Sequence, residues 1–300
     1  MPIQNPLVLG VLALGLVGLV FSQAQAQQPP KLPEPVELGL KTKDGVDITA
    51  TYYASLAGQQ AVPVLMLHGI GGSRADFHQA ALELQKDKFA VLVPDLRGHG
   101  NSTRRGTQTL DLAKFTPKDY EAIGLDIDAC KNFLVGENNK EALNIDALSI
   151  VAAETSCILA INYAAFDWSW PRLPTGKQGQ DVKALVLLSP EWKFKTMEVI
   201  KALNHPALQS EVAVYVLVGD RNAGSLSDAK RIMDQLERGR RNQDTKNAVM
   251  LQVNTTLQGT KMLNLPNLNL NADHVRKFVD IYARQKNFPY KYRGNPITGD

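Results

Sequence analysis

The chain has 300 residues, 44% of them hydrophobic, with a formal net charge of +3 and two cysteines. This hydrophobic share supports a buried core, and the length allows one well-buried α/β domain or two small ones. The small net charge argues against nucleic acid as a partner, and two cysteines exclude a disulfide-rich scaffold or a cysteine-based zinc site.

The first 26 residues are typical of a secretory signal peptide. An apolar block from Pro6 to Phe21 is followed by Ala24-Gln25-Ala26, an Ala-x-Ala cleavage pattern. Lys and Arg are missing ahead of the block, so an uncleaved anchor is the alternative, although the block is shorter than the roughly 20 residues of a spanning helix. We expect export to a periplasm or to the outside of the cell, with no stable membrane span after cleavage. The predicted segments are a signal peptide at 1–26, a linker at 27–35, a folded domain at 36–285 and a tail at 286–300.

The next elements predict a mostly parallel sheet behind an antiparallel hairpin. The hairpin joins residues 36–42 and 46–53 through the turn Lys43-Asp44-Gly45. The later strands are apolar throughout and alternate with helices, as expected for a sheet covered on both faces. The predicted later strands are residues 62–67, 89–93, 148–152, 184–188, 212–218 and 249–253. The predicted helices are residues 75–84, 117–134, 158–165, 228–236 and 273–284.

One strand runs directly into a helix through Ala152-Ala153-Glu154-Thr155-Ser156. A sharp strand-to-helix turn needs small residues two positions on either side of its centre, and Ala152 and Ser156 meet this requirement around Glu154. Two other interpretations stay open. In one, Ser156 is the centre, but its flanks would then be Glu154 and Ile158, which are too large. In the other, Glu154 only complements the N-terminus of an ordinary helix.

Two glycine-rich motifs follow successive buried strands, namely 68–72 (HGIGG) and 94–102 (PDLRGHGNS). In this order, and with the turn at Glu154, they resemble the α/β-hydrolase superfamily, particularly small-lidded members such as dienelactone-hydrolase-like and serine-aminopeptidase-like proteins. The resemblance covers nearly all of the chain after the signal peptide. It implies a single-domain α/β-hydrolase fold, with a mostly parallel sheet, helices on both faces and an antiparallel N-terminal hairpin.

The resemblance also implies a catalytic triad, and all three of its positions carry unsuitable residues. Glu154 takes the place of the nucleophile, Asn222 that of the acid, with Asp220 nearby, and Gln258 that of the histidine. Glutamate has no hydroxyl for an imidazole to activate, and an amide does not stabilise an imidazolium as a carboxylate does. The triad is therefore degenerate, and serine-hydrolase catalysis cannot run unmodified.

Backbone groups survive such substitutions, so the resemblance still implies oxyanion-type N–H donors at Ile70 and Thr155. His68 and His99 belong to the two glycine-rich motifs, where we expect them to be architectural. His274 begins the last predicted helix and is a weak substitute for the missing histidine. A surface position is the preferred interpretation of that residue.

We expect an exported pseudoenzyme that binds a small ligand or protein partner of unknown identity, with no cofactor and no metal. In this hypothesis an ionised Glu154 accepts the hydrogen bonds of Ile70 and Thr155 as a built-in anion. The alternative is an active ester or acyl hydrolase with the Glu154 carboxylate as nucleophile and His274 with Asp220 as the pair that activates water.

A metal site built from Glu154, Glu191, Asp220 and His68 is a third, weaker alternative, because no spacing motif supports it. Cys130 and Cys157 both fall on predicted helices that the resemblance places on the same face of the sheet. In an exported protein they form a possible disulfide, provided that their Cα atoms lie within about 7 Å.

Overall fold

The computed structural model describes Met1 and residues 31–174, 176–240, 247–264 and 272–294. Its compact unit begins at Leu32. Residues 2–26 of the predicted signal peptide and residues 27–30 of the predicted linker lie outside the described residues. Within the described ranges, no helix is long and apolar enough to cross a membrane.

The predicted hairpin is confirmed as β1 (Val36–Lys41) and β2 (Val46–Tyr53), paired antiparallel. Thr42 closes its turn, since the hydroxyl oxygen accepts a 2.8 Å hydrogen bond from the Val46 N–H. Strand β2 then pairs antiparallel with β4 (Phe89–Pro94), which joins the hairpin to the rest of the sheet.

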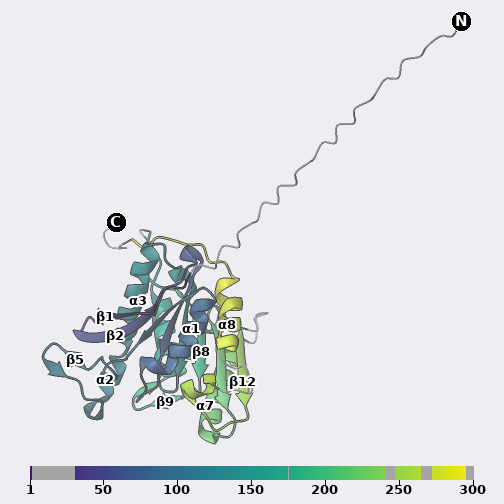
Figure 1. Ribbon diagram of the computed structural model, residues 1–300. Helices are drawn as coiled ribbons and strands as arrows, with labels where there is room; N and C mark the ends of the chain where they lie inside the picture. Colours follow the sequence, from purple (N-terminus) through teal and green to yellow (C-terminus); the bar gives the residue numbers. More distant parts are fainter. Residues whose placement is uncertain (2–30, 175, 241–246, 265–271, 295–300) are drawn as a thin grey trace. The chain divides into compact units, whose positions relative to one another are not determined.

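The described residues form a ten-stranded sheet in the order β12-β11-β8-β7-β3-β4-β2-β5-β6, with β1 paired to β2 (Figure 1). All neighbours from β12 to β4 are parallel, and β3, β4, β7, β8 and β11 are buried along their whole length. Burial on both faces explains why their sequences are unbroken apolar runs. The remaining bounds are β3 (Val62–Leu67), β5 (Arg104–Arg105), β6 (Gln108–Thr109), β7 (Leu148–Ala153), β8 (Val182–Leu188), β11 (Ala213–Gly219) and β12 (Ala248–Val253).

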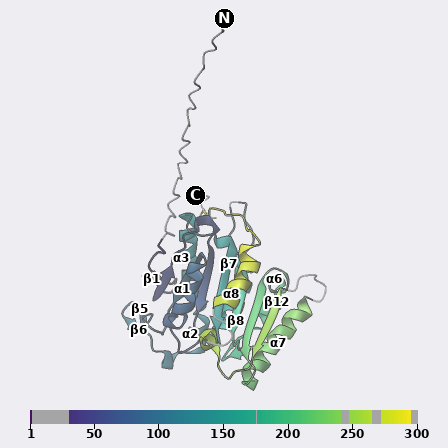
Figure 2. The same ribbon diagram turned by 45° about the vertical axis from the view of Figure 1, so that its right-hand side comes forward.

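Helices cover both faces of the sheet. On one face, α1 (His78–Lys86) and α8 (Ala272–Val279) lie side by side (Figure 2). The other face packs against α3 (Gly124–Asn139), α4 (Ser156–Ser169) and α7 (Ala223–Gly239). Shorter elements are α2 (Pro117–Glu121), α5 (Ile200–Leu203), α6 (Pro206–Ser210), a π-helical turn at Asp280–Arg284 and a separate hairpin of β9 (Lys193–Phe194) and β10 (Met197–Glu198).

The helix predicted over 117–134 is two helices, α2 and α3. A capping box of Thr116 and Asp119 starts α2, as the sequence indicates. The break comes at Ile123, which is fully buried, and Gly124 opens α3. Glycine is a poor helix former, so this position favours a new start over a continuous helix.

The order of the strands places a switch point between β3 and β7. From β3 the chain adds β4 on one side and then β7 on the other. In such sheets the crevice at the carboxyl ends of the two strands is the usual ligand site. Here β3 ends directly before the 68–72 motif, and β7 ends directly before Glu154.

The C-terminal tail is bound to the folded unit by asparagine side chains that contact its main chain. Asn144 donates to the Phe288 carbonyl at 2.7 Å, and Asn138 donates to the Lys291 carbonyl at 3.0 Å. Asn139 pairs with Arg293 twice, through the carbonyl and the N–H of that residue, each at 2.8 Å. Residues 288–293 are thus part of the compact unit.

The possible disulfide is not formed, because both cysteines are free and buried. Cys130 on α3 and Cys157 on α4 do lie on the same face of the sheet. The Cys157 thiol, however, donates to the Ala152 carbonyl at 3.2 Å. Burial raises the pKa of both thiols well above the ordinary value, which keeps them protonated and weakly reactive.

Candidate functional site

The turn after β7 keeps the backbone of a nucleophile elbow. Only Glu154 and Thr155 separate the end of β7 from the start of α4, and Glu154 has φ = 53°. This left-handed conformation costs a residue with a side chain roughly 1–2 kcal/mol. The Glu154 N–H donates to the Leu188 carbonyl at 2.8 Å, which holds the turn against β8.

The alternative in which Ser156 is the centre of the turn is wrong. Ser156 is fully buried in the first turn of α4, and its hydroxyl donates to the His68 carbonyl at 2.5 Å. That hydroxyl ties α4 to the 68–72 motif and is not directed at a substrate. Glu154 alone has the conformation that projects a side chain out of the turn.

The Glu154 side chain lies between two glycines. A Cβ atom added at Gly69 would be 2.4 Å from Oε2 of Glu154, and one added at Gly259 would be 2.9 Å from its Cδ. Both distances are below normal contact, so the missing side chains leave the space that the carboxylate fills. The Gly259 loop is held in place by Ser189, whose hydroxyl oxygen accepts from the Gly259 N–H at 3.0 Å.

Gln258 directly precedes Gly259, so the structure brings the predicted histidine loop to Glu154. Asn222 serves a different purpose: its side-chain oxygen accepts from the Ser225 N–H at 3.0 Å and caps α7. Asp220 is exposed at the end of β11. The residues at the acid position are thus a helix cap and a surface carboxylate.

His274 is not brought to the turn. Its Nδ1 lies 3.4 Å from the Tyr215 hydroxyl. Tyr215 is aligned with Val186, and Val186 with Val151, three residues before Glu154. At the usual rise of a strand this is about 10 Å below the turn, so the prediction of His274 as a substitute base finds no support in the geometry.

The two predicted backbone donors do not bind Glu154. Among the hydrogen bonds of the described residues, neither the Ile70 N–H nor the Thr155 N–H has an acceptor. The built-in anion predicted at Glu154 is therefore not formed. The carboxylate lies against Gly69 and Gly259 instead.

Two further carboxylates, missed as a pair by sequence reasoning, lie near the turn. The Thr155 hydroxyl donates to Glu191 at 3.1 Å, and Asp228 accepts from the Trp192 N–H at 3.1 Å. Burial raises the pKa of Glu191, and the charges of Glu154 and Asp228 add to this, while the Thr155 hydrogen bond opposes it. The only sequence signal was the position of Glu191 shortly after a buried strand.

The two motif histidines are architectural, as expected. His68 Nε2 accepts from the Leu96 N–H at 3.0 Å and its Nδ1 lies 2.8 Å from the Gly69 carbonyl, while His99 Nε2 accepts from the Gly71 N–H at 3.0 Å. Burial lowers the pKa of His68 to about 4, so its ring is neutral at pH 7.

The metal alternative is not supported. Across the described ranges, no group of three or more His, Cys, Asp or Glu side chains is arranged to hold a metal ion. Five cavities of the described residues also leave Glu154 out of their walls.

A family model described as the alpha/beta hydrolase fold matches residues 62–204, which include both glycine-rich motifs and the turn. This match supports the assignment of the chain to the α/β-hydrolase superfamily. The single-domain α/β-hydrolase fold predicted from the motifs is likewise confirmed. The search of curated protein sequences found no match to the chain.

Solved structures of esterases and of a dienelactone hydrolase are similar to the chain over most of its length. An esterase of Pyrococcus furiosus has a TM-score of 0.61 at 15% identity, covering 83% of this chain and 93% of its own. The dienelactone hydrolase of Anabaena variabilis gives 0.58 at 17%, covering 84% and 100%. A hyperthermophilic esterase from Pyrobaculum calidifontis gives 0.60 at 14%, covering 85% and 84%. At such identities the similarity establishes the fold alone.

Proposed function

We propose that this α/β-hydrolase-fold protein has lost serine-hydrolase catalysis and acts by binding a small ligand or a protein partner. One observation carries the proposal: the strained residue of the elbow is Glu154, whose carboxylate fills the space between Gly69 and Gly259. A carboxylate in this position has no hydroxyl for an imidazole to activate, so the nucleophile of a serine hydrolase is missing.

The other two triad positions support the same proposal. Asn222 is used to cap α7, and Gln258 stands where a general base would be needed. His274 is engaged by Tyr215 well below the turn. An elbow without an imidazole beside it lacks the group that activates a nucleophile in serine hydrolases.

The test is hydrolysis of a panel of short aryl esters and thioesters by the purified protein and its Glu154→Gln variant, beside an active esterase. We expect both proteins to give only the background rate of buffer. Turnover in the wild type that disappears in Glu154→Gln would overturn the proposal. Turnover that is equal in both proteins would also contradict it, since it would place catalysis at another site.

A second candidate is an active ester or acyl hydrolase with Glu154 as nucleophile, and Glu191 favours it. Burial raises the pKa of Glu191, which favours the protonated carboxyl more than at an exposed glutamate. Attack by the Glu154 carboxylate would form an acyl anhydride while Glu191 protonates the departing alcohol. Water, deprotonated by Glu191, would then hydrolyse the anhydride. Mass spectrometry of rapidly quenched protein should find the acyl group on Glu154, and its absence during turnover would exclude this mechanism.

We also propose that the protein is exported, to a periplasm or to the outside of the cell. The support is the pattern of residues 1–26, an apolar block followed by Ala24-Gln25-Ala26. Fractionation of producing cells and N-terminal sequencing test this proposal. We expect a chain that begins at Gln27 in the exported fraction, and a chain of full length in the cytoplasm would contradict it.

A further inference from the structure

A cavity of about 620 Å³ lies at the amino ends of the parallel strands, whereas Glu154 lies at their carboxyl ends. Its walls include Trp168 at the end of α4, Phe288 of the C-terminal tail and Lys183, the second residue of β8. Since β7 and β8 are parallel and Glu154 follows the last residue of β7, this cavity is separate from the candidate active site. Its volume is within the usual range for sites of small molecules.

Lys183 is a buried cation that forms no ion pair with a described residue. Only 8% of the residue is exposed. Its ammonium donates to the Gln180 carbonyl at 2.7 Å and lies 4.4 Å from the centre of the Trp168 ring and 4.9 Å from that of Phe288. No carboxylate of the described chain forms an ion pair with it. Burial lowers the pKa of Lys183 to about 8, and the charge of Lys177 adds to this effect.

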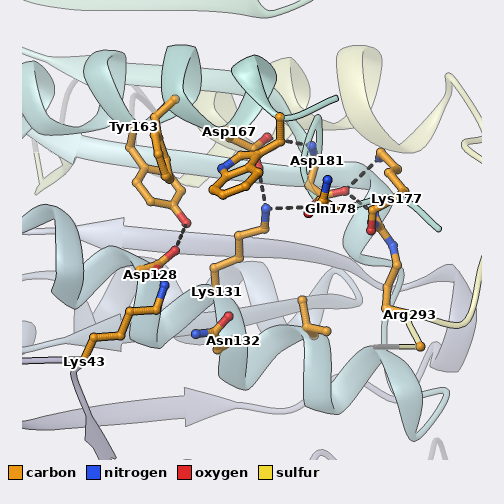
Figure 3. Close-up of a pocket in the computed structure, with 14 residues that line it drawn as sticks. Lys43, Asp128, Lys131, Asn132, Tyr163, Asp167, Lys177, Gln178, Asp181 and Arg293 are labelled. Carbon is orange, nitrogen blue, oxygen red and sulfur yellow. Dashed lines mark hydrogen bonds and ion pairs between the residues drawn. The ribbon is translucent and has the colours of Figure 1, made fainter. Parts of the chain in front are cut away.

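The carboxylates of this region are already bound to other cations. Lys131 and Lys177 each lie 2.8 Å from Asp181, and Arg293 contacts both Asp181 and Asp146. Figure 3 shows these three cations gathered around Asp181, in a neighbouring pocket that shares Lys177 and Arg293 with the cavity. These acids act on Lys183 only from a distance, where they partly oppose the effect of burial on its pKa, and none of them forms an ion pair with it.

The remaining charges of the cavity wall are mostly positive. Arg172 and Lys291 are exposed at its rim, and the remaining carboxylate of the wall, Glu211, is exposed as well. Three cations, counting Lys183, thus face one acid. An anion in this cavity would compensate the buried ammonium and be attracted by the rim.

We propose that the cavity binds a small organic anion, with a carboxylate or phosphate at Lys183 and a flat apolar group against Trp168 and Phe288. The rings of Trp168 and Phe288 would give the ligand apolar contact area, and the hydrogen bond with the Lys183 ammonium would fix its orientation. Both parts of the ligand are required, so neither a neutral ring compound nor a bare inorganic anion should bind as well.

The experiment is calorimetric titration of the purified protein with benzoate, phenyl phosphate, benzyl alcohol and inorganic phosphate. We expect benzoate or phenyl phosphate to bind with a Kd of about 1 mM or tighter, and the other two probes about tenfold more weakly. Whichever aromatic anion binds more tightly identifies the headgroup. Equal affinity for benzoate and benzyl alcohol would overturn the proposal, as would no binding of either aromatic anion at about 10 mM.

A variant pair separates Lys183 from the general charge of the protein. Lys183→Met should weaken binding of the aromatic anion about tenfold, while Lys201→Met, a surface change on α5 outside this cavity, should leave it unchanged. Lys183→Met should fold, because it removes a cation that burial disfavours. Equal affinity of Lys183→Met and the wild type would overturn the proposal.

A measurement on the wild-type sequence needs no variant. After reductive methylation with ¹³C-formaldehyde, the Lys183 signal can be titrated by NMR. Saturating benzoate should raise the pKa of Lys183, because a bound anion stabilises the ammonium form. An unchanged titration under saturating benzoate would contradict the proposal.

Discussion

The carboxyl ends and the amino ends of the parallel strands, called here the carboxyl edge and the amino edge of the sheet, differ in how their charged side chains are paired. At the carboxyl edge, Glu154 and Glu191 lie near each other, and neither forms an ion pair with a described residue. At the amino edge, Asp181 is surrounded by Lys131, Lys177 and Arg293. The difference shows that hydrogen bonds of the backbone and of uncharged side chains such as Ser156 and Ser189 maintain the turn at the first edge. The second edge depends on complete pairing of buried charges.

The largest expected effect is at Asp181. Burial alone would raise its pKa, but Lys131, Lys177 and Arg293 together lower it to about 2. Asp181→Ala leaves buried cations unpaired, so we expect the free energy of unfolding to fall by about 3–5 kcal/mol in urea titrations.

The matched control is Asp47→Ala, which removes the partner of Lys41 in a pair whose side chains are 51% and 67% exposed. Such a pair contributes at most about 1 kcal/mol. Similar losses for the two variants would contradict the view that the amino edge depends on buried pairing.

The next effect is a loss of stability in acid, caused by His68. The folded pKa is about 4 against 6.5 for the unfolded ring, so the unfolded chain binds more protons between these values. The stability contributed by the neutral ring is complete above pH 6.5 and is lost as the pH falls toward 4, by about 3 kcal/mol. Urea titrations at pH 7, 5.5 and 4 measure the loss. It should be smaller in His68→Asn, and an equal loss in that variant would exclude His68 as the cause.

A smaller effect tests the strain at the turn. Because Glu154 has φ = 53°, Glu154→Gly should be more stable than Glu154→Ala by about 1–2 kcal/mol. At Glu191, which does not have a positive φ, the order should reverse, with alanine the more stable by about 0.5–1 kcal/mol. Thermal melts of the four variants make the comparison, and a glycine preference at both positions would argue against strain specific to the turn.

The smallest effect tests the space between the glycines. Gly69→Ala brings its Cβ against Glu154 Oε2, so it should cost about 1 kcal/mol more in the wild type than in a Glu154→Ala background. Gly39→Ala is the control, since nothing lies within 4 Å of a Cβ there. If the Gly69→Ala cost is the same in both backgrounds, the carboxylate does not occupy this space.

Much of the fold was predictable from local pattern. Strand β3 was predicted with its observed bounds, because a strand buried on both faces is an apolar run with polar ends. The two-residue strands β5, β6, β9 and β10 were not predicted, because they are too short to show any periodicity. The break at Ile123 was missed because the apolar spacing continues across it.

The candidate site was predictable only in its backbone. Flanking small residues indicated the turn at Glu154, but nothing in the sequence showed that its carboxylate lies against Gly69 and Gly259. The ion pairs at the amino edge could not be predicted from the sequence for a similar reason. Asp181 and Arg293 are 112 residues apart, and periodicity carries no information about such contacts.

The docking of residues 288–293 has a consequence for what the molecule recognises. Asn138, Asn139 and Asn144 bind the main chain of this segment, much as a peptide receptor binds an extended ligand. Main-chain contacts do not depend on the identity of a side chain, so the requirements on the sequence of this segment come from three of its side chains. Phe288 lies against Lys183, the Tyr290 hydroxyl donates to the Asn138 carbonyl, and Arg293 reaches the buried acids. The chain thus carries its own tethered peptide, recognised at these three residues.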